Sequence, residues 1–208
     1  MNYGNFRRLV LEHIDQYAVA GVVIPDTYNN QADDTSRIPG LTNIALRTVA
    51  TQFVPLRVVV DPLSEEFGGE VTDMGNGWTK IRMPTDFYKM DGRGNPRMVN
   101  GEMTYSMNHW HLTDDTIMVK SSELTGMMLS YHRYPRHLYG HHDEVLDCTD
   151  SVADCISYYV AAMLAREDDA YSYQTLYNEY VNNLSLIKKP MTAELVHVMD
   201  AYDCFNMY

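Results

Sequence analysis

The hydrophobic positions at the start of the chain follow a helical period. Apolar side chains recur there at offsets of three and four residues, at Phe6, Leu9, Val10, Ile14 and Tyr17. This spacing predicts a helix with one buried stripe, and Gly21 is suited to end it. Residues 22–37 are rich in Asp and Asn, and we expect them to form a connector with many turns.

A second helix is predicted from Pro39, in its first turn, to the neighbourhood of Pro55. A mostly apolar stripe runs along it through Leu41, Ile44, Ala45, Thr48, Val49 and Gln52. The period then changes, because short β-branched and alternating segments such as LRVVVD and HWHLTDDTIMV predict strands between about Leu56 and Tyr134. Asn76-Gly77 lies between two of these segments and suits the positive φ of a hairpin turn.

Helical periodicity returns near Thr149, where Thr149, Asp150 or Ser151 can cap a third long helix. Its apolar face is formed by Val152, Ile156, Tyr159, Val160, Met163 and Leu164. A fourth helix follows the polar segment REDDAY, with a stripe formed by Tyr173, Leu176, Tyr177, Tyr180, Val181, Leu184 and Ile187. Pro190 is predicted to end this helix.

The residues after Pro190 carry another apolar stripe. Its members recur at three- and four-residue steps: Leu195, Val198, Met199, Tyr202 and Phe205. A helix this short is not stable alone in water, so the stripe needs a partner. It can dock back on its own bundle or on another subunit. We expect the second, because a chain end is free to reach outward, and we predict these five residues to be a partner-binding site.

These patterns together predict an α+β chain, in which a bundle of about four helices is interrupted by a small antiparallel β domain. The helical bundle would comprise residues 1–55 and 135–190, and the inserted β domain residues 56–134. Residues 191–208 would form a C-terminal arm or a short helix.

The composition restricts the classes of partner. Asp and Glu number 28 against 16 Lys and Arg, and the resulting formal charge of −12 repels DNA and anionic membranes. An acidic surface is still compatible with a conduit through which DNA slides without binding. The three cysteines, Cys148, Cys155 and Cys204, have no CxxC spacing and favour a reduced, cytosolic protein. No segment is apolar enough to span a membrane, and the N-terminus does not read as a signal peptide.

Histidine offers the best starting point for an enzyme. His109 and His111 would point to the same side of a strand, and four more histidines lie nearby in sequence: His132, His137, His141 and His142. No HExxH is present, however, and no Cys or carboxylate completes a ligand spacing. The GxG of DGRGNPR lacks the helix of a phosphate loop, and REDD is better explained as a solvated corner. We therefore predict no catalytic residue, no metal and no cofactor.

The amino-acid sequences of two long segments resemble those of the head-to-tail connector (adaptor) proteins of tailed bacteriophages. The first is DDTSRIPGLTNIALRTVATQFVPLRVVV, and the second, after the β insertion, is YPRHLYGHHDEVLDCTDSVADCISYYVAAMLAREDDAYSYQTLYNEYVNNL. In that family an early helical pair leads into a β elaboration. A helix of the type ALxYYVAAxLxxEDD and a long last helix rich in Tyr, Asn and Glu then follow.

The resemblance implies a structural virion protein in the neck, between capsid and tail, made in the host cytoplasm. It would form a homo-oligomeric ring, commonly twelvefold, beneath the portal protein, extend the DNA channel without binding DNA specifically, and offer a platform to tail or neck proteins. The helices would build the ring wall, and the C-terminal stripe would reach the portal or a neighbouring subunit. Two alternatives stay open: a small histidine-based metal-dependent enzyme, and an interaction module that is not built into particles.

Overall fold

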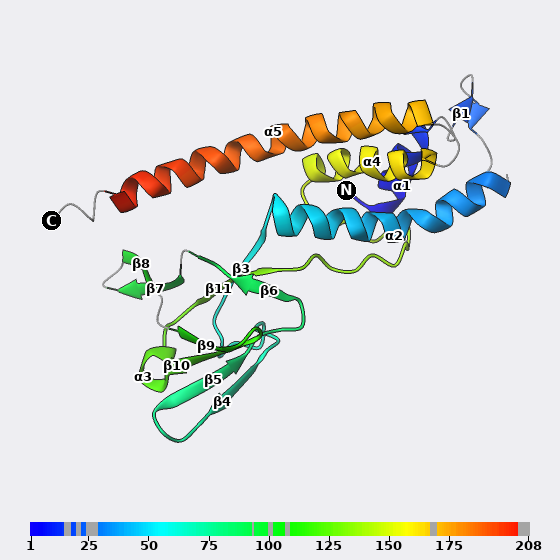
Figure 1. Ribbon diagram of the computed structural model, residues 1–208. Helices are drawn as coiled ribbons and strands as arrows, with labels where there is room; N and C mark the ends of the chain where they lie inside the picture. Colours follow the sequence, from blue (N-terminus) through cyan, green and yellow to red (C-terminus); the bar gives the residue numbers. More distant parts are fainter. Residues whose placement is uncertain are drawn as a thin grey trace. The chain divides into compact units, whose positions relative to one another are not determined.

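The computed structural model describes the backbone of residues 1–14, 18–19, 22–23, 29–92, 94–99, 102–106, 109–166 and 170–203. It contains helices and antiparallel sheets, so the predicted α+β class is confirmed (Figure 1). The chain divides into two compact units: Met1–Val54 with Pro135–Tyr208, and Pro55–Tyr134 between them. We call them the helical unit and the β unit.

The helical unit is built from four long helices. They are α1 (Tyr3–His13), α2 (Asn29–Gln52), α4 (Asp150–Ala165) and α5 (Ala170–Asp203), with a small hairpin of β1 (Ala18–Val19) and β2 (Val22–Val23). Two N-terminal caps follow from the sequence. The side chain of Asn2 accepts a hydrogen bond from the backbone N–H of Asn5, and that of Thr149 accepts one from Val152.

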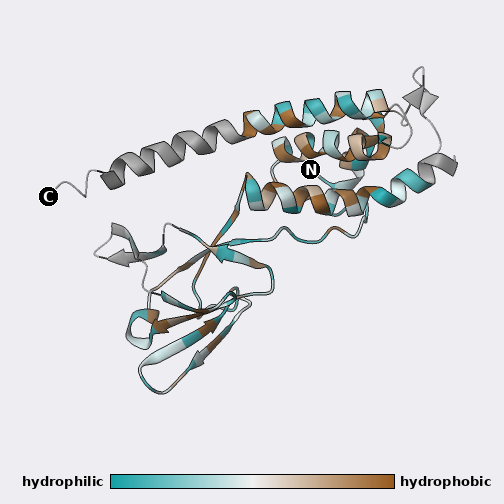
Figure 2. Ribbon diagram, in the orientation of Figure 1, coloured by the Kyte–Doolittle hydropathy of each residue, from teal (hydrophilic) through white to brown (hydrophobic). Residues whose placement is uncertain are grey.

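Helix α4 lies at the centre of this unit, in contact with α1, α2 and α5. It is mostly apolar along its length, as its brown colour in Figure 2 indicates. Ile156 and Val160 on α4 are fully buried, as are Phe6 and Val10 on α1 and Ile38 on α2. The contribution of α5 to this core comes from Leu176, Tyr180 and Leu184. Burial of these side chains is the main stabilising term for the unit.

The extended segment before α4 is fixed to α1 and α2 by specific contacts. The Asn43 side chain pairs with the backbone of Leu138, donating from Nδ2 to the carbonyl and accepting from the N–H, both at 2.9 Å. Gly140 has φ +93°, and a Cβ there would lie 2.9 Å from the Pro39 ring. Glycine is required at this position both for the left-handed backbone and for the close approach.

The β unit contains strands β3 to β11 and the four-residue helix α3 (Ser121–Leu124). A four-stranded sheet has the order β4-β5-β10-β9, with β4 at Glu70–Asp73, β5 at Trp78–Arg82, β10 at Thr116–Lys120 and β9 at His109–Thr113. A three-stranded sheet has the order β3-β11-β6, with β3 at Leu56–Val60, β11 at Leu129–Arg133 and β6 at Phe87–Met90. The third sheet is the hairpin of β7 (Asn95–Val99) and β8 (Glu102–Ser106). All these pairings are antiparallel.

The turn between β4 and β5 agrees with its sequence. Gly75 and Gly77 both have positive φ, at 70° and 82°. The Asn76 side chain accepts a hydrogen bond from the backbone N–H of Trp78 at 3.2 Å. Beyond this turn, Ile81, Ile117 and Leu129 are fully buried and form the centre of the β unit's own core with Phe67 and Met127.

Three helix boundaries differ from the sequence prediction. Helix α1 ends at His13, well before Gly21. Helix α2 begins at Asn29, so part of the predicted connector is helical and Pro39 lies inside the helix. Tertiary contacts explain this, because the neighbouring Ile38 is fully buried and the Pro39 ring packs against Gly140. Helix α5 continues through Pro190 to Asp203, so the prediction that Pro190 ends it is wrong. Proline removes one hydrogen bond and weakens a helix without always stopping it.

Replacing Ile156 by Asp is expected to abolish soluble folding. The side chain is fully buried at the centre of the helical unit, and an unpaired buried charge costs several kcal/mol, on the order of the whole stability of a domain. Val181→Asp on α5 is the matched control, because Val181 is 48% exposed and should tolerate a charge. Circular dichroism and the soluble yield measure the effect. A soluble, fully helical Ile156→Asp protein would contradict the assigned core.

Candidate functional site

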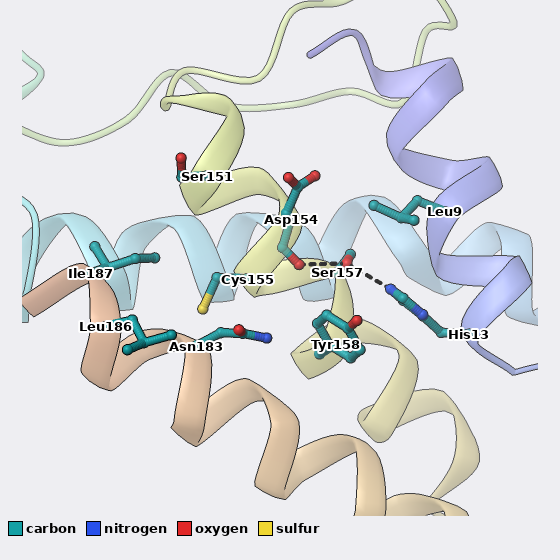
Figure 3. A pocket seen from close by; sticks show the side chains of 10 residues that line it. All are labelled: Leu9, His13, Ser151, Asp154, Cys155, Ser157, Tyr158, Asn183, Leu186 and Ile187. Atoms are coloured by element: carbon teal, nitrogen blue, oxygen red, sulfur yellow. Dashed lines mark hydrogen bonds between the residues drawn. The ribbon is translucent and has the colours of Figure 1, made fainter.

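A pocket of roughly 540 Å³ opens in the helical unit between α1, α4 and α5 (Figure 3). Its walls combine apolar and polar side chains: Leu9, His13, Ser151, Asp154, Cys155, Ser157, Tyr158, Asn183, Leu186 and Ile187. Their positions follow from helical periodicity, since the residues from α4 are spaced at one to four positions along one side of that helix. It is the natural place to test for catalytic chemistry.

His13 and Ser157 are hydrogen-bonded in this pocket, but they do not form a nucleophile and base. The Ser157 hydroxyl donates to the backbone carbonyl of Asp154 at 2.6 Å, so its only proton is already used. At 3.1 Å from the same oxygen, His13 Nε2 must therefore donate rather than accept. A general base would have to accept the serine proton. The pair thus fastens α1 to α4.

The environment of His13 favours the neutral imidazole. The ring stacks on Tyr158, with centroids 4.1 Å apart and planes inclined by 25°. Burial lowers the pKa of His13, while the charges of Glu12 and Asp154 partly oppose this effect. The Ser157 contact requires a proton on Nε2, so the neutral ring is the Nε2–H tautomer.

The two thiols that the structure describes in the helical unit, Cys148 and Cys155, are not activated. Cys155 is buried and donates from Sγ to the backbone carbonyl of Tyr180 at 3.7 Å. Burial raises the pKa of Cys155 to about 11 and that of Cys148 to about 12. Reactive cysteines need a stabilised thiolate, and both side chains are held in the neutral form instead.

A second polar cluster lies inside the β unit, around Asp91. Its Oδ2 accepts from Arg57 Nε at 2.6 Å and from the Ser130 hydroxyl at 2.9 Å. The backbone N–H of Ser130 donates to Asn95 Oδ1 at 3.3 Å, and Asn95 Nδ2 lies 3.1 Å from His109 Nδ1. The fully buried Asn95 therefore links β11 of one sheet to β9 of another. The cluster satisfies buried polar groups and fixes the two sheets to each other.

This cluster also determines the state of His109. Because Asn95 Oδ1 accepts from a backbone N–H, its amide nitrogen must face His109, and His109 Nδ1 must be the acceptor. Burial lowers the pKa of His109, and the nearby His111 lowers it further. The two rings meet edge to face at 5.2 Å. The Nδ1 lone pair of His109 is thus occupied by Asn95 and is not open to a metal ion.

The six histidines that lie near one another in the sequence are divided between the two units. His132 lies on β11 with Nε2 3.9 Å from Asp91 Oδ1, whereas His137, His141 and His142 belong to the helical unit. The part of the chain that the structure describes contains no group of three or more His, Cys, Asp or Glu side chains that could hold a metal ion. Sequence reasoning missed the Asp91 and Asn95 cluster, because Ser130, which contacts both, lies 39 and 35 positions away from them in the chain.

The predicted partner-binding residues are only partly described. Leu195, Val198, Met199 and Tyr202 lie within helix α5, but their side chains are outside the described part of the structure, as is Phe205 altogether. Their role as a partner-binding stripe therefore stays a prediction. The structure does place the first four of them on one continuous helix with the core residues Leu176, Tyr180 and Leu184.

Among the described residues, no helix has the length and apolar character needed to cross a membrane. Comparison with known proteins gives no family for this chain: no family model matches it, and no curated protein matches it.

The geometry of His13 predicts a pH-dependent contribution to stability. His13 has a lowered pKa when folded, so between about pH 7.5 and 5.5 the unfolded chain takes up more protons at this residue than the folded chain does. The contribution is present at the higher pH and is lost as the pH falls. His13→Gln keeps a donor for Ser157 and removes the titration. Urea unfolding should show that the stability of the unchanged protein falls relative to this variant on acidification. Parallel pH profiles would contradict the assignment.

Proposed function

We propose that this protein is a structural subunit of a phage head-to-tail connector, which forms a ring beneath the portal and carries the tail. The observation that carries the proposal is the placement of a complete β unit between α2 and α4 of one helical unit. This order, two helices, a β elaboration and two further helices, is the one that the connector resemblance implies.

The long last helix supports a role in assembly. Helix α5 has 34 residues and α4 has 16, so at 1.5 Å per residue they span about 51 Å and about 24 Å. Helix α5 therefore extends well past its neighbour, as Figure 1 shows. A helix that continues beyond its own bundle can present its side chains to another subunit. This is where the stripe of Leu195, Val198, Met199 and Tyr202 lies along the chain.

The chemistry of the polar clusters also favours a structural role. The Ser157 hydroxyl, the Asp91 carboxylate and the Asn95 amide each make contacts that hold elements together. The net charge of −12 suits a channel wall along which DNA moves without adhering. Ring subunits need rigid elements and lateral surfaces rather than an activated nucleophile.

The direct experiment is mass spectrometry of purified virus particles, combined with antibody labelling in the electron microscope. The proposal expects the chain in the particles at a stoichiometry close to that of the portal, with label at the neck. Its absence from particles would overturn the proposal and favour an interaction module that acts outside the virion.

Deleting residues 191–208 is expected to leave a folded protein that no longer joins portal rings. The buried residues that α5 contributes to the core, Leu176, Tyr180 and Leu184, all precede the deletion. Circular dichroism would establish folding, and co-sedimentation with the portal protein would measure binding. The full-length variant Leu195→Asp/Val198→Asp keeps the helix length and should lose binding in the same way. Normal binding by both variants, or insolubility of the truncated chain, would count against the assigned stripe.

A further inference from the structure

The four-stranded sheet of the β unit has one buried and one solvent-facing side. Cross-strand partners share a side of the sheet, and the buried side carries Ile81, Ile117 and Val119. On the opposite side, one row of partners crosses all four strands: Thr72, Lys80, Met118 and Trp110. Trp78 and Lys120 form the next row on that same side. We call this side the outer face.

Around Trp110 the outer face is apolar and basic although the chain is acidic, and Glu70 lies in the row beyond Lys80, opposite Arg82. Trp110 and Leu112 on the edge strand β9 are 54% and 56% exposed. The Trp78 and Trp110 rings contact each other with centroids 5.4 Å apart, so the aromatic surface is continuous across strands. Lys80 and Lys120 flank it, and within the described part of the chain neither forms an ion pair. Exposed aromatic side chains flanked by unpaired cations are typical of a binding surface.

The segment that leads into the other edge strand, β4, carries the complementary properties. Residues 61–77 contain five acidic residues and no Lys or Arg: Asp61, Glu65, Glu66, Glu70 and Asp73. Leu63 in the loop before β4 is 58% exposed. This loop therefore presents an apolar side chain next to the exposed carboxylates of Glu65 and Glu66.

The acidic loop is held in a defined conformation. Leu63 N–H donates to Asp61 Oδ1 at 2.8 Å, and the Ser64 hydroxyl donates to the Asp61 carbonyl at 2.8 Å. The Phe67 side chain anchors the loop in the core of the β unit, with 3% of its surface exposed. A surface ordered before binding loses little conformational entropy on association.

We propose that the outer face of one copy, centred on Trp110 with Lys80 and Lys120, binds the acidic loop of a second copy at Leu63, Glu65 and Glu66. This inference rests on the proposed ring and names one contact that would build it. The first surface lies on the outer face of β5, β10 and β9, and the second lies in the loop before β4, so they are separate parts of one copy. Each copy therefore offers one surface to each of two neighbours, a head-to-tail arrangement that gives a ring when the rotation between neighbours closes.

The charge balance favours a protein partner over a nucleic acid. Aromatic side chains between lysines can also bind single-stranded DNA or RNA. The chain as a whole carries a formal charge of −12, however, and this field opposes a polyanion. The acidic loop brings only a few charges, and it supplies an apolar side chain for the tryptophans as well.

Charge reversal on the full chain tests the contact. Sedimentation velocity at low salt, about 50 mM, should detect self-association that weakens when salt screens the charges. Lys80→Glu/Lys120→Glu should raise the concentration needed for association by about tenfold or more. Adding Glu65→Lys/Glu66→Lys to the same chain reverses both surfaces and should restore association. Lys89→Glu, on β6 of the other sheet, is the matched control and should behave like the unchanged protein.

Each result supports or overturns the inference. Rescue by the fourfold variant, with unchanged circular dichroism for all variants, establishes the contact. Monomers at every concentration, unchanged association of the Lys80→Glu/Lys120→Glu variant, or no rescue would each overturn it. Binding of a labelled oligonucleotide would also overturn the inference, if the Lys80→Glu/Lys120→Glu variant abolishes that binding while self-association persists. Mass spectrometry of particles tests the connector role separately, so a virion protein that fails these assays keeps that role and loses this contact.

Discussion

The burial of helix α4 is the constraint on which the rest of the helical unit depends. Nine of its 16 residues are buried, and these face more than one direction around the helix. A helix of this kind needs neighbours on several sides, and α1, α2 and α5 supply them. Two of those neighbours precede the β unit in the chain and one follows α4. After the β unit, the chain must therefore place α4 against α1 and α2. The β unit is an insertion in the sequence of the helical unit because of this packing.

Much of this architecture could be predicted from periodicity. The stripes containing Phe6, Ile156 and Tyr180 mark three helices correctly, because a helix that buries one side has few alternatives for its apolar positions. Thr149 caps α4 as expected, and Gly77 has the positive φ that its turn requires. Local chemistry determines these features within a few residues, so one sequence is enough to find them.

The errors arose where distant contacts decide the outcome. Asn29 begins a helix although its neighbours suggest a connector, and Pro39 sits within that helix against Gly140, about a hundred positions away. The link from Asn95 to Ser130 and His109 depends on the packing of two sheets. The histidine pair looked like a ligand set in the sequence, and only the amide of Asn95 reveals that one nitrogen is already engaged. Surfaces for other subunits are harder still to predict, because their partners are not in the chain.

The two asparagines that shape the β unit differ in how they age. An asparagine side chain deamidates when the backbone nitrogen of the next residue attacks its amide, and that reaction is fastest before glycine. Asn76 precedes Gly77 in an exposed turn, so it is a position at which stored protein would acquire a new carboxylate. Asn95 precedes Pro96, whose nitrogen has no hydrogen and cannot complete the attack. The buried amide that joins the two sheets is thereby protected from this route of deamidation, whereas the exposed turn accumulates deamidated Asn76 over time.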